Sequence, residues 1–484
     1  MSKPAKVIPI MSASAEVEDS AQFVSMYQKQ PTIYPRAVKG WFANWRWVFV
    51  WLTQLLFYGL PWLQWSGRQA VLFDLDAQRF YIFGLLLYPQ DLIFLAALLV
   101  LSALALFFFT AVAGRLWCGY TCPQTVYTEI FMWAERMIEG DRVARMRLDQ
   151  QPWRWRKIWR KGAKHSAWLS IALFTGFSFV GYFTPIRELA ADVASWNLSG
   201  WNAFWVLFYG AATYGNAGFL REQMCKYMCP YARFQSALID KDSLIITYDA
   251  KRGDPRGSRS RKADSAAHGL GDCIDCTLCV QVCPTGIDIR NGLQNECIGC
   301  AACIDVCNDV MDKMGYARGL IRYSTENGVV NGWTRLQMFK RALRPRVLIY
   351  GAVLSAASVT FAASVAMRSP FKFDVVKDRG ALARVVEEGA VENVYRIQIM
   401  NRTEAPQTYR VSASGIDGLE VVAMPASAGP AAVTSTSVSL RLPFVVAQGL
   451  AGRSVPVMFA VTGVEPTSGT SADRSAIQFE KSTF

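Results

Sequence analysis

Long apolar runs separated by polar segments dominate the chain up to residue 367. Each run is close to the ~20 residues that a helix needs to cross a bilayer. The run that begins at Leu92 is apolar on all faces and uncharged, which is unusual for a buried helix of a soluble protein. A shorter apolar stretch, 80–88, is expected to lie in the interface or to re-enter the membrane. The pattern predicts five transmembrane helices, at 44–63, 92–113, 166–185, 203–220 and 347–367.

The loops between these runs differ in positive charge. Lysine and arginine are frequent in 114–165, whereas 186–200 holds only Arg187 against two acidic residues. Because positive loops stay in the cytoplasm, the first loop and the N-terminus are predicted to be cytoplasmic. The net charge of +13 is therefore read as a membrane-protein bias and not as a sign of nucleic-acid binding. We expect a multi-pass protein of the bacterial inner membrane without a signal peptide.

The pattern changes again after Pro370, where short runs of alternating polar and apolar residues are punctuated by Gly, Pro, Asn and Ser. Such runs predict a small antiparallel β-sandwich of the Ig-like class. The expected fold is a multi-domain membrane protein: a five-helix α region, a two-cluster ferredoxin-like α+β segment and a C-terminal Ig-like β-sandwich. The predicted parts are a cytoplasmic tail (1–43), four helices with loop 114–165 (44–220), a cytoplasmic iron–sulfur segment (221–346), a fifth helix (347–367) and a periplasmic domain (368–484).

Eight of the twelve cysteines form two runs with the spacing Cys-x2-Cys-x2-Cys-x3-Cys. This is the arrangement of bacterial ferredoxins with two 4Fe-4S clusters, in which the fourth ligand of each cluster comes from the other run. A pair of zinc sites is the alternative, but zinc ribbons use separated Cys-x2-Cys pairs. One cluster is predicted to bind Cys273, Cys276, Cys279 and Cys307. The other is predicted to bind Cys297, Cys300, Cys303 and Cys283.

A basic segment, 251–262, precedes the first ferredoxin run. It is interpreted as a flexible linker that faces anionic lipid headgroups, and nucleic-acid binding is the less favoured reading. Only two histidines occur, and His165 at the start of the third predicted span is expected to be an ordinary interface residue. A histidine-rich metal centre is therefore not expected.

The four remaining cysteines form a repeated Cys-x3-Cys-Pro motif, with one copy just past the second predicted span and one just past the fourth. The repeat predicts two helical hairpins that bring Cys118, Cys122, Cys225 and Cys229 together at the cytoplasmic membrane face. A helical motif would place both of its thiols on one side. The proline after each motif suits the start or the break of a helix.

Several kinds of chemistry fit these four thiols. Nearby arginine or lysine would lower the thiol pKa, and soft thiolates select Cu(I), zinc or iron–sulfur clusters. Met224 and Met228 could add thioether ligands or could simply be packing residues. Inert buried cysteines, disulfide exchange and another cofactor stay open as alternatives.

These motifs resemble those of the FixG/CcoG (RdxA) family of cytochrome oxidase accessory proteins. The resemblance includes the segment from Arg68, both Cys-x3-Cys-Pro motifs with the residues that follow them, both ferredoxin runs and the C-terminal sandwich. It implies a role in maturing the cbb-type oxidase, with reduction of Cu(II) to Cu(I) for copper insertion. It places copper handling, and the catalytic step, at the four thiols of the Cys-x3-Cys-Pro motifs and the 4Fe-4S clusters at the eight ferredoxin cysteines.

Two other functions compete with a cupric reductase. One is a polyferredoxin that passes electrons between the quinone pool and a periplasmic reductase. The other is a copper-binding assembly scaffold without enzymatic activity. Expected partners are the lipid bilayer and either assembly factors of the cbb-type oxidase or a copper chaperone or transporter. The electron donor and the assembly state, including a homodimer, stay open.

Overall fold

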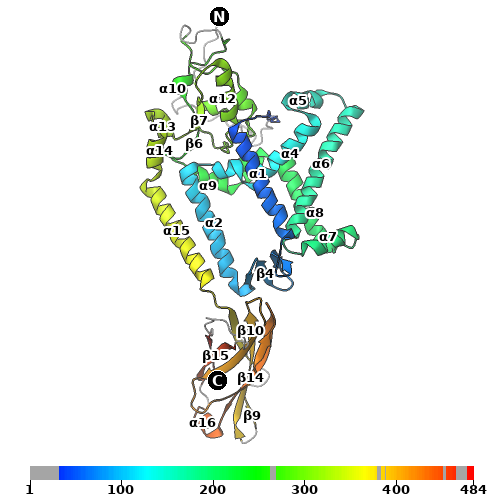
Figure 1. Ribbon diagram of the computed structural model, residues 1–484, viewed down its shortest axis with the longest axis vertical. Coiled ribbons are helices and arrows are strands. Elements are labelled where there is room, and N and C mark those ends of the chain that lie inside the picture. Colours follow the sequence, from blue (N-terminus) through cyan, green and yellow to red (C-terminus); the bar gives the residue numbers. More distant parts are fainter. Residues whose placement is uncertain are drawn as a thin grey trace, which may run out of the picture.

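The computed structural model describes residues 32–261, 269–378, 383–386, 389–450, 454–464 and 477–483. Long helices form its middle part, a cysteine-rich segment lies at one end, and a β-sandwich lies at the opposite end (Figure 1). The predicted N-terminal tail lies, up to residue 31, outside the described residues. This arrangement separates the two ends of the molecule by the length of its longest helices.

A helix occupies each region in which the sequence predicts a membrane span. These helices are α1 (Trp41–Gly59), α2 (Leu92–Ala113), α6 (Trp155–Val180), α8 (Gly200–Gly215, continued by a π-helical turn over Asn216–Leu220) and α15 (Pro345–Ala366). Among the described helices, two are long and apolar enough to cross a membrane by length and composition, Pro89–Ala113 and Pro345–Ala366. Membrane association follows from these two, and the five-helix region stays a prediction.

The other three helices differ from α2 and α15 for identifiable reasons. α1 contains Arg46, α8 is short, and α6 begins well before residue 166, so that its first turns consist of basic residues of the predicted loop. α1 and α8 nevertheless turn large apolar side chains outward, among them Leu55 (67 % exposed) and Leu207 (60 % exposed). Contiguous apolar surface of this kind is rare on soluble monomers, and it suits contact with lipid.

Glycine residues set the closest helix contact. A β-carbon at Gly176 of α6 would lie 2.3 Å from the carbonyl oxygen of Val206 in α8, so only glycine permits this approach. α2 and α15 form a second antiparallel pair, in which Phe94 meets Phe361 with ring centroids 6.3 Å apart. In Figure 1 this pair stands apart from the group formed by α1, α4, α6 and α8.

Shorter helices fill the predicted loops. The loop 114–165 contains α3 (Leu116–Tyr120), α4 (Pro123–Glu139), α5 (Arg142–Gln150) and the start of α6. The loop 186–200 contains α7 (Ile186–Ala194), and α9 (Pro230–Leu238) follows a π-helical turn over Met224–Met228. Short 3-10 helices span Leu60–Trp62 and Pro89–Asp91.

The apolar stretch 80–88 is not a membrane segment of the expected kind. It supplies most of a three-stranded antiparallel sheet made of β3 (Val71–Asp74), β4 (Arg79–Ile82) and β5 (Leu85–Leu87), beside the small pair β1 (Gln64–Trp65) and β2 (Arg68–Gln69). Its apolar residues are explained by contact with the sandwich, because Leu72, Tyr81, Leu86 and Tyr88 share a core with Met400.

The cysteine-rich segment is built on one antiparallel pair, β6 (Ile245–Tyr248) and β7 (Ile321–Ser324). Helices α10 (Ala250–Gly253), α11 (Leu278–Gln281) and α12 (Ala302–Met314) lie between the two strands in the sequence, and α13 (Glu326–Asn331) and α14 (Arg335–Ala342) lead on to α15. A 3-10 turn spans Ile289–Asn291. Buried Ile246, Ile304, Met311 and Leu320 share their core with cysteines of both runs.

The expectation of a flexible basic linker is wrong for residues 251–261. Arg256 forms an ion pair with Asp254 at 2.9 Å, and the guanidinium of Arg259 donates to the hydroxyl of Tyr316 at 3.0 Å. Arg252 is paired with Asp272. Arg252 and Arg259 therefore hold this segment against the ferredoxin fold, its contact with lipid headgroups stays a prediction, and residue 262 lies outside the described residues.

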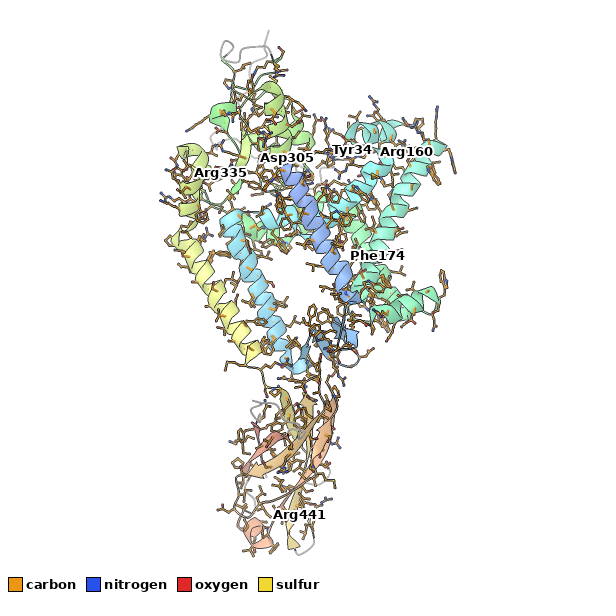
Figure 2. The ribbon with its side chains drawn as sticks, viewed as in Figure 1. Tyr34, Arg160, Phe174, Asp305, Arg335 and Arg441 are labelled. Atoms are coloured by element: carbon orange, nitrogen blue, oxygen red, sulfur yellow. The ribbon has the colours of Figure 1, made fainter. Side chains whose placement is uncertain are left out.

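One carboxylate joins the cysteine-rich segment to α1. The side chain of Asp305 on α12 accepts hydrogen bonds from the backbone N–H groups of Phe42 (3.3 Å) and Ala43 (2.8 Å). These are unpaired donors of the first turn of α1, which a carboxylate caps favourably. Asp305 lies where α12 meets the start of α1 (Figure 2).

The C-terminal part is a two-sheet antiparallel sandwich, as predicted. One sheet has the order β12-β14-β10-β8 with β9 paired to β10, and the other has the order β13-β11-β15-β16. Alternate residues such as Ile397, Val438 and Phe459 are fully buried between the sheets. The strands are β8 (Phe371–Lys377), β9 (Arg384–Val385), β10 (Val391–Asn401), β11 (Gln407–Ser414), β12 (Glu420–Ala423), β13 (Ala426–Ala428), β14 (Val433–Leu442), β15 (Pro456–Val464) and β16 (Ile477–Thr483), with α16 at Phe444–Gly449.

A buried ion-pair triad connects the sandwich to the helices. Asp91, at the start of α2, is paired with Arg368 after α15 (2.7 Å) and with Arg402 of the sandwich. The hydroxyl of Tyr88 donates to the carbonyl oxygen of Asn401 at 2.9 Å. Both contacts fix the sandwich at the end of the helices that lies opposite the cysteine-rich segment.

Candidate iron–sulfur and thiol site

The eight ferredoxin cysteines line two neighbouring cavities. Cys273, Cys276, Cys279 and Cys307 line a cavity of ≈ 370 Å³. The second, of ≈ 330 Å³, is lined by Cys283, Cys297, Cys300 and Cys303, and Cys279 also reaches it. Each cavity thus combines three cysteines of one run with the fourth cysteine of the other run. The structure brings together the same two sets of four that the spacing predicts, and their binding of iron stays a prediction.

The surroundings of these sulfurs fit 4Fe-4S clusters. Burial raises the pKa of the Cys297 and Cys307 thiols to about 12, although backbone N–H groups of Gly299 and Ile321 favour their thiolates. Thiolates at such dry positions require cations nearby, which cluster iron provides. Among the described residues, no three His, Cys, Asp or Glu side chains converge as ligands of a single ion would.

Positive backbone angles let the chain wrap around both cavities. Gly299 (φ 71°) lies inside the second run, Gly286 (φ 71°) follows the first, and Ala301 (φ 60°) also has a left-handed conformation. Ala301 lies between Cys300 and Cys303 in the sequence, and both of these cysteines line the second cavity. Cys276 is exposed, whereas Cys279 and Cys300 are buried. The first cavity therefore includes an exposed cysteine, whereas none of the four cysteines assigned to the second cavity is exposed.

Each Cys-x3-Cys-Pro motif is bent between its cysteines. Cys118 lies in α3 and Cys225 in the π-helical turn, but Cys122 and Cys229 have extended backbones at the N-caps of α4 and α9. Neither motif is one continuous helix, so the condition under which both thiols would share one helix face is not met, and each proline marks the start of a helix. The following prolines begin the next helices, at the first-turn position where proline is favoured. The bends leave one thiol of each motif at a helix N-terminus.

The four thiols of the two motifs do come together. Cys225 interacts electrostatically with Cys118, Cys122 and Cys229, and Cys122 interacts with Cys229. The side-chain amide of Gln124 donates to the backbone carbonyl oxygens of Asn216 (2.9 Å) and Arg221 (3.1 Å), which joins the first motif to the second. The repeat thus forms one group of thiols, and their role as copper ligands stays a prediction.

The prediction that basic residues lower the pKa of these thiols is wrong for Cys118, Cys122 and Cys225, because burial raises the pKa of all three. Burial raises the pKa of Cys118 to about 11 and that of Cys225 to about 12, and Arg115 opposes the change only weakly. Arg115 is occupied elsewhere, because its guanidinium donates to the backbone carbonyl oxygens of Ala232 (2.8 Å) and Cys297 (3.4 Å). The thiols are thus neutral at physiological pH until a metal ion favours their thiolates.

The thiol group lies directly against the second ferredoxin run. Cys118 and Cys225 pack against the buried residues Ile298 and Cys300. A β-carbon at Gly119 would lie 2.7 Å from the carbonyl oxygen of Gly299, so the main chains of the two motifs are in contact. Cys225 and Cys300 also line one cavity of ≈ 530 Å³. The three cavities are thus linked in series by shared cysteines, Cys279 and then Cys300.

Gln235 is a further residue of this site, and no role for it was predicted from the sequence. It is fully buried, and its side-chain amide lies 3.4 Å from the Cys118 sulfur, with which it can exchange a hydrogen bond. Burial of an amide requires polar partners, and the thiol is one of them. A glutamine in the short helix that follows Cys229-Pro230 is the sequence signal that could have identified it.

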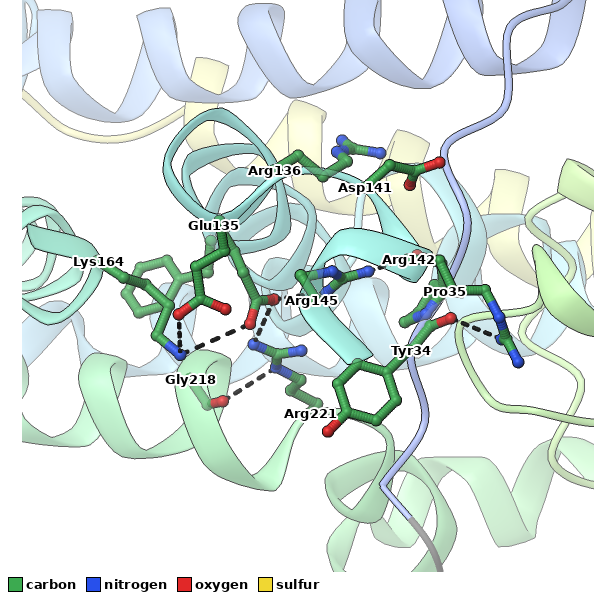
Figure 3. A network of polar contacts seen from close by, with 12 residues as sticks. Tyr34, Pro35, Glu135, Arg136, Asp141, Arg142, Arg145, Lys164, Gly218 and Arg221 are labelled. Atoms are coloured by element: carbon green, nitrogen blue, oxygen red, sulfur yellow. Dashed lines mark hydrogen bonds and ion pairs between the residues drawn. The ribbon is translucent and has the colours of Figure 1, made fainter. Parts of the chain in front are cut away.

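A buried charge network fixes the second motif (Figure 3). Arg221, four residues before Cys225, donates to the carboxylate of Glu135 (3.0 Å) and to the carbonyl oxygen of Gly218 (2.9 Å). Arg145 donates to the same carboxylate oxygen at 2.8 Å. Burial alone would raise the pKa of Glu135, but Arg221, Arg145 and Lys164 hold it below its usual value. The carboxylate therefore stays ionised and anchors the second motif to α4.

His165 has a structural environment, as the sequence predicts. Its Nδ1 lies 2.9 Å from the hydroxyl of Tyr214, and its ring stacks on Phe219. It does not approach the four thiols through any described contact. His268 lies outside the described residues.

Comparison with protein families identifies three matching parts. Residues 220–326 match a 4Fe-4S dicluster domain, and residues 95–139 match a 4Fe-4S binding domain. Residues 361–484 match the IG-like fold at the C-terminus of FixG, which that description classes as an oxidoreductase. The matches cover the cysteine-rich segment, the first thiol motif and the sandwich.

Three relatives are similar over most of the chain. The nitrogen fixation protein FixG of Rhizobium meliloti (strain 1021) is 36% identical over 422 residues, which cover 81% of this chain and 80% of the relative. Protein RdxA of Cereibacter sphaeroides is 38% identical over 404 residues, covering 81% and 84%. Protein RdxB of the same organism is 38% identical over 399 residues, covering 81% and 83%.

Proposed function

Because the chain belongs to the FixG/RdxA family of iron–sulfur oxidoreductases, we propose that it reduces Cu(II) to Cu(I) at the thiol group. The thiol group consists of Cys118, Cys122, Cys225 and Cys229. The Cu(I) formed there serves the maturation of the copper centre of a cbb-type oxidase. Copper is the substrate of this reaction and not a resident cofactor.

The observation that carries this proposal is the shared cavity of Cys225 and Cys300. Cys300 also lines the second cluster cavity, so no protein layer separates the thiol group from the cluster ligands. When bound, the clusters supply electrons one at a time, which is the number that reduction of Cu(II) requires. The exposed position of Cys276 makes the first cavity the entry side for a cytoplasmic one-electron reductant.

The thiol group has the donor chemistry for the product. Each Cu(II) gains one electron and becomes Cu(I), and the reductant loses one electron. Soft thiolates prefer Cu(I), so their binding favours the reduced ion. Copper binding releases the thiol protons, and the positive charge of the ion offsets the unfavourable burial of the thiolates at Cys118 and Cys225. Gln235 is placed to orient the sulfur of Cys118 during this exchange.

We also propose that the helices span the bacterial inner membrane several times. Support comes from the apolar outward faces of α1, α2, α8 and α15 and from the positions of the other parts at opposite ends of these helices (Figure 1). With the basic loop in the cytoplasm, the cysteine-rich segment is cytoplasmic and the sandwich is periplasmic. The sandwich is then available to oxidase assembly factors or to a copper chaperone or transporter.

A Cu(I)-specific chromophore tests the proposal. The purified protein with intact clusters is reduced without oxygen, freed of reductant and mixed with Cu(II). The wild type should produce Cu(I), and a variant with serine at all four positions of the thiol group should not, although its clusters remain. Equal Cu(I) from both proteins would contradict the proposal and would favour a scaffold or an electron carrier with another acceptor.

A further inference from the structure

A buried arginine of α1 lies between the clusters and the thiol group. Arg46 is 9% exposed, and it lines the cavity that Cys225 and Cys300 share. A buried guanidinium is unfavourable unless it is paired, and in a membrane segment such a residue usually serves a function. Its main partner is Glu129 of α4, whose carboxylate oxygen lies 2.8 Å from the guanidinium.

The need to neutralise Glu129 does not by itself explain why Arg46 is buried at this position. The second oxygen of the Glu129 carboxylate is paired with Arg136 at 3.0 Å, so the carboxylate already has a cation on its other side. Arg136 lines a different cavity and is not part of the one that Cys225 and Cys300 share. Of the two arginines, Arg46 is thus the one that lines a cavity together with the cluster ligand Cys300.

The two charges act on the Cys300 sulfur in opposite directions. Arg46 and Glu129 both line the cavity that Cys300 lines, so one positive and one negative charge lie near its sulfur. Interactions between charges are strong where water is excluded. Reduction of a cluster adds one negative charge that its sulfurs share, and charge near the sulfurs is one of the factors that set its potential.

We propose that Arg46 and Glu129 form a buried charge pair that sets the reduction potential of the cluster held by Cys283, Cys297, Cys300 and Cys303. Arg46 stabilises the reduced state of this cluster and raises its potential, whereas Glu129 lowers it. Both are positioning residues that act through the environment of Cys300. The inference holds whether copper or another acceptor takes the electron.

An anaerobic redox titration followed by electron paramagnetic resonance tests the proposal. The wild type should show two midpoint potentials. Arg46→Gln should lower one of them, with at least a tenfold change in the reduced-to-oxidised ratio at fixed potential, about 59 mV for one electron. Glu129→Gln should raise the same one, and the other should stay unchanged in both variants.

Arg136→Gln is the matched control, because it removes the other cation of Glu129 and leaves Arg46 in place. It should move the sensitive potential less than Arg46→Gln does. Arg46→Lys keeps the positive charge, so its midpoint potential should be close to that of the wild type. If Arg46→Gln does not retain the cluster, Arg46→Lys and Glu129→Gln still allow the test. Unchanged potentials in Arg46→Gln and Glu129→Gln, or shifts of the same sign in both, would overturn the proposal.

Discussion

The main chain of Gly119 lies against that of Gly299 so closely that a β-carbon on Gly119 would be 2.7 Å from the Gly299 carbonyl oxygen. Gly119 lies between the two cysteines of the first thiol motif, and Gly299 lies between Cys297 and Cys300. The first thiol motif and the second ferredoxin run therefore touch through backbone atoms as well as through side chains. Electron tunnelling weakens steeply with distance, so this contact is where the proposed transfer is most sensitive to structure.

Replacing Gly119 by alanine should slow formation of Cu(I) without loss of the clusters. The added β-carbon meets backbone atoms that cannot rotate away, so α3 must move from the ferredoxin loop. A displacement of about 1 Å can slow a reaction by up to about 10²-fold. The measurement is the initial rate of Cu(I) formation by the reduced protein, with iron content determined on the same sample.

Gly162→Ala is the control for this substitution. Gly162 lies in α6, and an added β-carbon there has no neighbour within 4 Å. The control should increase helix stability by about 0.5–1 kcal/mol and leave the rate unchanged. Equal rates in Gly119→Ala and in the control would show that the close approach of Gly119 to Gly299 does not affect formation of Cu(I).

The two cavities predict which cysteines belong to the same cluster. Cys283→Ser and Cys303→Ser should remove the same paramagnetic signal, although the two residues lie in different runs. Cys307→Ser should remove the other signal, although Cys307 is the near neighbour of Cys303 in the sequence. Loss of one common signal in Cys303→Ser and Cys307→Ser, with Cys283→Ser affecting the other, would mean that each run binds its own cluster.

Short-range spacing explains why much of this site could be predicted from the sequence. The ferredoxin spacing sets which loop surrounds each cluster, and the repeated Cys-x3-Cys-Pro motif sets where the thiol group forms. The bend between Cys118 and Cys122 agrees with the proline that follows the motif, because a proline at N1 of the next helix leaves the preceding residue extended. The predicted lowering of the thiol pKa values is wrong because burial, which depends on the tertiary fold, outweighs the effect of a nearby arginine.

Contacts between residues that are far apart in the sequence could not be predicted either. Arg46 was read as part of an apolar span, and nothing local indicates that Glu129 and Cys300 are its neighbours. The stretch 80–88 was read by its hydropathy alone, although its apolar side chains serve the contact with Met400 of the sandwich. Both cases depend on partners far away in the sequence.

Asp305→Ala should destabilise the attachment of the cysteine-rich segment to α1. The substitution removes the carboxylate that accepts from the N–H groups of Phe42 and Ala43, and loss of such a cap costs about 0.5–2 kcal/mol. The measurement is thermal unfolding in detergent. Asp309→Ala on the same helix removes an exposed ion pair with Lys313 and should change stability by about 0.5 kcal/mol or less. A larger loss in Asp309→Ala than in Asp305→Ala would contradict the capping role.

Glu135→Gln should destabilise the protein at neutral pH and have little effect in acid. The folded-state pKa of Glu135 is held below its usual value of 4.5, so its stabilising contribution is present above that pH and is lost as the pH falls through the folded-state pKa. Removal of the charge leaves Arg145 and Arg221 without their buried carboxylate, whereas Lys164 keeps Glu139 at 3.1 Å, and the expected change is about 3–5 kcal/mol. Unfolding free energies of both proteins from pH 7 down to pH 3 should converge below about pH 4.5. A constant difference over this range would contradict the assignment.

Electron counting in a single turnover tests most directly whether the thiol group is where the cluster electrons leave the protein. The wild type and the variant with serine at Cys118, Cys122, Cys225 and Cys229 are reduced to the same extent, freed of reductant and mixed with limiting Cu(II). Visible absorption follows reoxidation of the clusters while a chromophore reports Cu(I). The wild type should form one Cu(I) for each electron that its clusters lose, and the variant should keep its clusters reduced. Equally fast reoxidation of both proteins by Cu(II), with the same yield of Cu(I), would contradict a role of the thiols in copper reduction.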